Sequence, residues 1–137
     1  MLTLVGWISG LSATGVVIFS VIMGLFVIYK SRKINANLLF CMGLVFIFAG
    51  LCWSAGFIDI VTILLTGNNM DNSYGLFGIW AYMWIPPMFI TALYISAEIM
   101  IPEKKWYIVP IYVVLGVIFE IFLFMDPFGS CTFVYAY

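Results

Sequence analysis

The chain has 137 residues, of which 66% are hydrophobic and 8% are charged, and its mean hydropathy is +1.21. Soluble domains carry roughly 25% charged residues, so this composition cannot cover a surface for water, and it predicts an integral membrane protein. The net charge of −1 provides no basic patch for nucleic acid, and the absence of histidine removes the commonest metal ligand and general base.

The first apolar run covers residues 4–29, and no basic segment precedes it. A cleaved signal peptide needs positive charge before a short apolar core, so we interpret this run as a permanent transmembrane helix. Small residues follow a near-heptad line along it and should let the backbone of a second helix approach closely. This expected packing face consists of Gly6, Gly10, Ala13, Ser20 and Gly24. The alternative is the general frequency of glycine in membrane helices.

The second apolar run, residues 38–66, is predicted as one helix after a connection at residues 30–37. Counted from Leu38 at about 1.5 Å per residue, Asp59 lies ~31 Å along this helix, near the outer boundary of a hydrocarbon core ~30 Å thick. We interpret Asp59 either as a solvated carboxylate at the helix end or as part of an outward-facing polar cavity.

The third run, residues 76–101, follows a loop of turn-forming residues at 67–75. One face of it carries aromatic, hydroxyl and carboxyl groups at steps of four and three, namely Trp80, Trp84, Pro87, Thr91, Tyr94 and Glu98. Such a stripe should face protein or water rather than lipid, although the two tryptophans also suit an aromatic belt. Pro86 and Pro87 each remove a backbone donor, which predicts a kink near Tyr82–Pro87.

The fourth run covers residues 106–125 and contains Glu120, ~21 Å into the core when counted from Trp106. No basic residue lies at this depth, so we expect a protonated acid that faces the bundle or bonds to hydroxyls or water. The alternative is a proton, cation or ligand site. Glu98 should instead pair with the lysines of the connection at residues 102–105.

All Lys and Arg residues lie in the first and third connections, at Lys30, Arg32, Lys33, Lys104 and Lys105. Four helices place these connections on one side, which the positive-inside rule makes cytoplasmic, with both termini outside. The predicted fold is therefore an all-α polytopic membrane protein. Residues 1–126 form one four-helix domain, and residues 127–137 form an extracytoplasmic apolar tail leading to further helices or a partner.

Two segments, GNNMDNSYG and PEKKWYIVPIYVVLGVIFEIFLFMD, resemble uncharacterised archaeal multi-helix membrane proteins. The resemblance extends over most of the chain and implies further helices after the fourth, in the layout of seven-helix membrane sensor domains. It carries no functional residue over to this sequence.

The sequence holds no catalytic set, no cofactor motif and no metal-ligand pattern, so we expect neither an enzyme nor a cofactor protein. The leading interpretation is a helical bundle that acts in assembly, anchoring or sensing, as a homo-oligomer or with a membrane-protein partner. The second is a small transporter or channel component that uses Asp59 and Glu120. The third is an intramembrane enzyme or cofactor protein. The candidate polar site comprises Asp59, Glu120, Trp80, Trp84, Thr91 and Tyr94.

Overall fold

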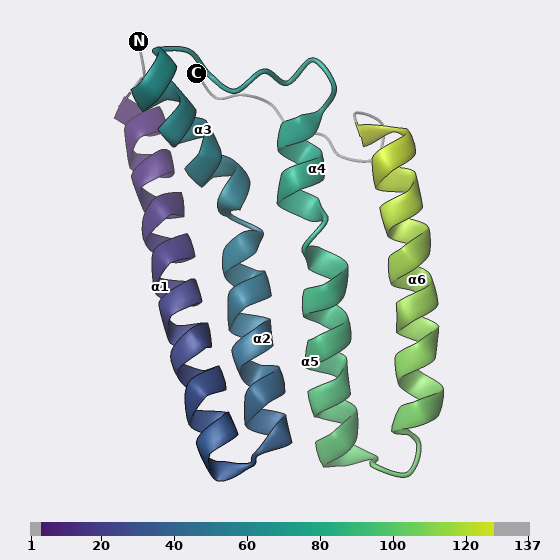
Figure 1. The fold of residues 1–137 in the computed structure, drawn as a ribbon. Helices are drawn as coiled ribbons and strands as arrows, with labels where there is room; N and C mark the ends of the chain where they lie inside the picture. The colour runs from purple at the N-terminus through teal and green to yellow at the C-terminus, as the bar shows by residue number, and fades with distance from the viewer. Residues whose placement is uncertain (1–3, 128–137) are drawn as a thin grey trace.

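The computed structural model describes residues 4–127, which form helices and no strands (Figure 1). The helices are α1 (Leu4–Ile34), α2 (Asn37–Leu51), α3 (Ser54–Thr66), α4 (Leu76–Tyr82), α5 (Ile85–Met100) and α6 (Lys105–Met125). Within these residues, α1, the α4–α5 pair and α6 are each long and apolar enough to cross a membrane, and the bent α2–α3 pair is a fourth such span when its two helices are counted as one. The predicted class of an all-helical membrane protein is confirmed. The apolar tail beyond Pro127 lies outside the described residues.

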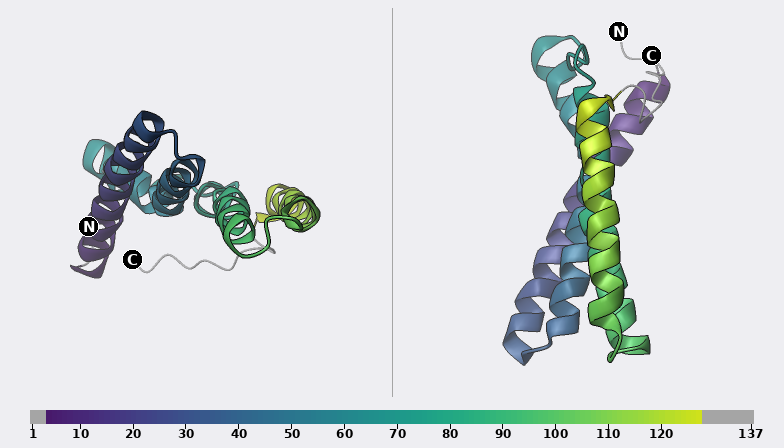
Figure 2. Two further views of the ribbon diagram at one scale, coloured as in Figure 1. Left: turned by 90° about the horizontal axis from the view of Figure 1, so that it is seen from below. Right: turned by 90° about the vertical axis from the view of Figure 1, so that its right-hand side faces the viewer.

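The spans stand side by side in an open row rather than around a closed core (Figures 1 and 2). α1 packs against α2 and α3, α2 packs against α5, and α5 packs against α6. α6 is therefore attached mainly through α5, with a small contact to α4. α1 crosses the row obliquely, as the second view in Figure 2 shows.

Two glycines bring α1 and α2 close together near the middle of their contact. A Cβ atom built on Gly24 would lie 2.9 Å from the carbonyl oxygen of Gly43, and one built on Gly43 would lie 2.9 Å from the carbonyl oxygen of Gly24. These backbones approach so closely that a methyl group on either residue would force them apart.

The same face of α1 continues towards its N-terminal end over α2 and α3. The contacts are Ser20 with Gly50, Ala13 with Gly56, and Gly10 with Ile60. Of the expected packing face, Gly10, Ala13, Ser20 and Gly24 thus lie against the second span. Gly6 lies one turn nearer the N-terminal end of α1 than Gly10.

The second span is not one continuous helix, so this part of the prediction is wrong. α2 and α3 meet at an angle of 46°. At the break the Trp53 N–H donates to the Gly50 carbonyl at 3.0 Å, one residue nearer than in an α-helix, and the Ser54 hydroxyl donates to the Leu51 carbonyl. α1 crosses the second span obliquely, so a straight second span would contact α1 only near one crossing point. The bend lets both α2 and α3 contact α1.

The first connection is shorter than predicted. α1 continues through the basic segment to Ile34, which leaves Asn35 and Ala36 between the helices. Lysine and arginine are good helix formers and so prolong α1. Asn35 makes the reversal with a φ of 52°, a left-handed conformation that asparagine tolerates better than most residues.

The third span is interrupted at Met83 and Trp84, inside the stretch for which a kink is predicted. Pro86 and Pro87 lie in the first turn of α5. Backbone N–H groups in a first turn have no partner within the helix, so proline is tolerated there. The interruption therefore precedes the prolines, and α4 and α5 together still count as one span.

Candidate functional site

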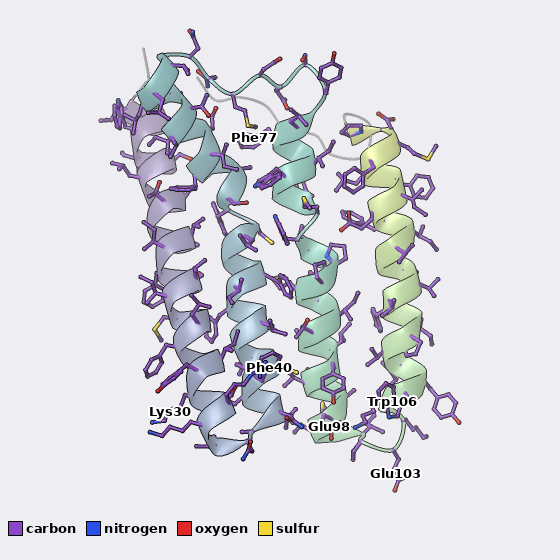
Figure 3. The ribbon with its side chains drawn as sticks, viewed as in Figure 1. Lys30, Phe40, Phe77, Glu98, Glu103 and Trp106 are labelled. Carbon is purple, nitrogen blue, oxygen red and sulfur yellow. The ribbon has the colours of Figure 1, made fainter. Side chains whose placement is uncertain are left out.

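The basic connections lie together at one end of the row, where Figure 3 labels Lys30, Glu98 and Trp106. Glu98 forms an ion pair with Lys105, with 2.5 Å between Oε2 and Nζ, which confirms the predicted pairing with a connection lysine. The Lys105 ammonium also lies 5.8 Å from the centre of the Tyr94 ring and 5.6 Å from that of Trp106. Glu98 and Tyr94 thus belong to an interfacial cluster that joins α5 to the start of α6.

Asp59 is buried at the opposite end, with 4% of its surface exposed. Its Oδ1 accepts a hydrogen bond of 2.8 Å from the backbone N–H of Met70, in the connection between α3 and α4. The interpretation of Asp59 as a solvated helix-end carboxylate is therefore wrong. Counting depth along a helix does not reveal that the following loop folds back over its end.

The connection at residues 67–75 is ordered by short-range hydrogen bonds. Asn72 Oδ1 accepts the backbone N–H of Phe77 at 3.0 Å, in the first turn of α4. The Asp71 carboxylate accepts the backbone N–H of Ser73 at 3.0 Å and its hydroxyl at 3.1 Å. These bonds, the backbone one foremost, hold the pKa of Asp71 below its ordinary value.

An aromatic cluster joins the third span to α2. The Trp84 ring stacks on Phe48 of α2, with 6.3 Å between ring centres, and meets Trp80 edge-on at 6.5 Å. The Trp84 indole N–H is buried and has no hydrogen-bond partner among the described residues. Trp84 therefore packs between helices, and this face of α5 points towards α2.

The candidate polar site is not brought together by the fold. Thr91 donates its hydroxyl hydrogen bond within α5, to the Pro87 carbonyl at 2.7 Å. Trp84 lies towards α2, whereas Pro87 lies towards α6, because α5 stands between these two neighbours. α4 stands between α3, which contains Asp59, and α6, which contains Glu120 (Figure 1). These two carboxyl groups therefore form no pair that would share a proton or a cation.

An open groove of about 510 Å³ runs between α5 and α6. Pro86 and Pro87 line one wall, Gly116 and Val117 line the other, and Glu120 is its one ionisable lining residue. A Cβ on Gly116 would lie 3.1 Å from the Pro86 Cβ, so glycine permits the close approach of α6. Within residues 4–127, Glu120 makes no hydrogen bond or ion pair.

The sequence predicts the depth of Glu120 but does not reveal the groove. Gly116 precedes Glu120 by one helical turn, so the pair marks a small residue and an acid on the same face. That spacing is the signal in the sequence that indicates a helix contact beside the acid. The groove itself depends on how α6 is placed against the prolines of α5, which the sequence pattern of α6 does not contain.

The fold and the groove define a polytopic helical membrane protein in which Glu120, a carboxyl group inside a span, lacks a partner among the described residues. No protein-family model matches the chain, and no curated protein or solved structure is significantly similar to it. Residues 4–127 contain no group of three His, Cys, Asp or Glu side chains placed to hold a metal ion.

Proposed function

We propose that this protein is a membrane-embedded assembly unit, which binds other transmembrane helices against the side of α6 that carries the groove. Anchoring or sensing would then act through the helices that it binds. Exposed apolar side chains on α6 do not support this by themselves, because lipid accepts them as well as protein does. The support comes from Glu120.

Glu120 is the observation that carries the proposal. Ionisable side chains inside membrane spans are costly and normally face a bundle interior or a watery cavity, where they pair with other groups. Glu120 lies ~22 Å along α6 from Lys105, well inside the span, yet it faces an open groove without a partner in residues 4–127. A helix docked in the groove would supply the missing polar partner and exclude lipid from the carboxyl group.

We also propose an orientation. Every Lys and Arg of this sequence lies either in the last turns of α1 or at the junction of α5 and α6, and both lie at the same end of the row (Figure 3). The positive-inside rule makes this end cytoplasmic and places residues 67–75 and both termini outside. Helices beyond the fourth, which the resemblance to archaeal multi-helix membrane proteins implies, would cover the α6 face in the same way as a separate partner.

Single-cysteine labelling in the membranes of the native host tests the assembly proposal. Val117 lies in the groove and Leu115 on the far side of α6, and their exposed fractions are nearly equal, at 54% and 53%. In a background without native cysteines, a thiol reagent dissolved in lipid should label Val117→Cys several-fold more slowly than Leu115→Cys. In dilute liposomes of purified protein the two should react equally. Equal labelling in the native membranes as well would refute the proposal.

A further inference from the structure

We infer that the groove between α5 and α6 binds a transmembrane helix carrying a lysine or arginine at the depth of Glu120. This inference rests on the proposed function and specifies the chemistry of the partner. It follows from three features of the chain: the unpaired carboxyl group, the absence of cations from the spans, and the open shape of the groove.

A cationic partner for Glu120 is not found among these 137 residues. The basic residues of this sequence lie in the last turns of α1 and where α6 begins, at the end of the row where Figure 3 labels Lys30 and Trp106; they are Lys30, Arg32, Lys33, Lys104 and Lys105. A second copy in the same orientation would bring its own basic residues to that same end. Since intramembrane charges pair with opposite charges, a lysine or arginine on a further helix docked against α6 matches Glu120 best.

The shape of the groove favours a helix as the carrier of the cation. The groove is open to the side and continues into the exposed apolar surface of α6, where Val113 and Val117 are 39% and 54% exposed. A partner that extends along the span can cover this surface over several turns. A helix also satisfies its own backbone hydrogen bonds, which any segment in the hydrocarbon core must do.

Energy transfer in liposomes tests the inference with the full chain and two synthetic peptides. One is a leucine–alanine transmembrane helix with a single lysine at the depth of Glu120, and the other has norleucine in its place. The lysine peptide should bind the wild-type chain about tenfold more tightly than Glu120→Gln. Glu103→Gln is the matched control, because it removes the same charge from the exposed α5–α6 connection. It should bind like the wild type, and the norleucine peptide should bind all three chains equally weakly.

Glu120→Gln could bind weakly because it misfolds, so its thermal unfolding is compared with that of the wild type. A second variant tests the groove without changing the carboxyl group. Val117→Phe retains the carboxyl group but fills the groove, so it should weaken binding of the lysine peptide as well. Equal binding of the lysine peptide to the wild type and Glu120→Gln would overturn the inference. So would self-association that depends on Glu120, since a second copy would then be the occupant. Neither result contradicts the proposed function, which is the docking of a helix against α6. The cysteine labelling described above tests that docking.

Discussion

Replacing Gly24 with alanine tests the close packing of α1 on α2. The added Cβ would lie 2.5 Å from Cγ1 of Ile47 and 2.9 Å from the carbonyl oxygen of Gly43, whereas ordinary contacts are 3.4–4 Å. The Ile47 side chain can rotate away from the new methyl group. The Gly43 oxygen belongs to the backbone, so it moves only if the two helices separate.

The magnitude follows from two opposing effects. Overpacking of this kind costs about 1–3 kcal/mol. Alanine returns about 0.5–1 kcal/mol because it is a better helix former than glycine. Gly15→Ala isolates the second effect, since it lies on the same helix and a Cβ there meets nothing within 4 Å. The difference in unfolding free energy between the two variants should therefore be about 1–3 kcal/mol, because helix propensity cancels.

Equilibrium unfolding in mixed detergent micelles, followed by circular dichroism, measures this difference. Gly15→Ala should be at least as stable as the wild type, and Gly24→Ala should be the less stable of the two variants. Equal stability of the two variants would refute the reasoning. The distance between α1 and α2 would then not be limited by the backbone contact of Gly24 with Gly43.

Three further predictions concern the orientation, the connection between α3 and α4, and the ion pair of Glu98 with Lys105. In a cysteine-free background, an impermeant thiol reagent applied to intact cells should label Ser73→Cys but not Asn35→Cys, and the reverse pattern would overturn the proposed orientation. Asp59→Ala should lower the unfolding free energy by about 1–3 kcal/mol and speed proteolysis of the connection between α3 and α4, because it removes the acceptor of the Met70 N–H. An unchanged cleavage rate would contradict this role of Asp59. Glu98→Gln should cost at most about 1 kcal/mol, because its pair with Lys105 lies at the end of the span. A larger loss in the same denaturation assay would mean that the pair is held away from water.

The sequence predicts the number of spans well because the bilayer leaves few choices. An apolar run of sufficient length has to satisfy its backbone hydrogen bonds internally, so it becomes a helix. The line of small residues on the first helix is also informative. Four of its members, including Gly10 and Gly24, lie against the second span, since close backbone approach needs small side chains.

The remaining features depend on neighbours, which a pattern within one helix does not show. The break after Leu51 has no proline to mark it and follows the oblique path of α1. Asp59 is buried because a later loop covers it. The stripe on the third span divides because α5 has a neighbour on each side, so Trp84 packs on α2 while Pro87 faces α6.

α1 and α6, the helices at the two ends of the row, differ in length, and this difference has a consequence for the surrounding lipid. The apolar part of α1, residues 4–29, is ~39 Å long and α6 is ~32 Å long, against a hydrocarbon core of ~30 Å. α6 therefore fits nearly upright, whereas α1 fits only when tilted, in keeping with its oblique course in Figure 2. The contact of Gly24 with Gly43 ties α1 to α2, so α1 cannot change its tilt alone when the bilayer thins or thickens. The lipid on the α1 side has to deform instead, and the cost of that hydrophobic mismatch would favour membranes of one thickness.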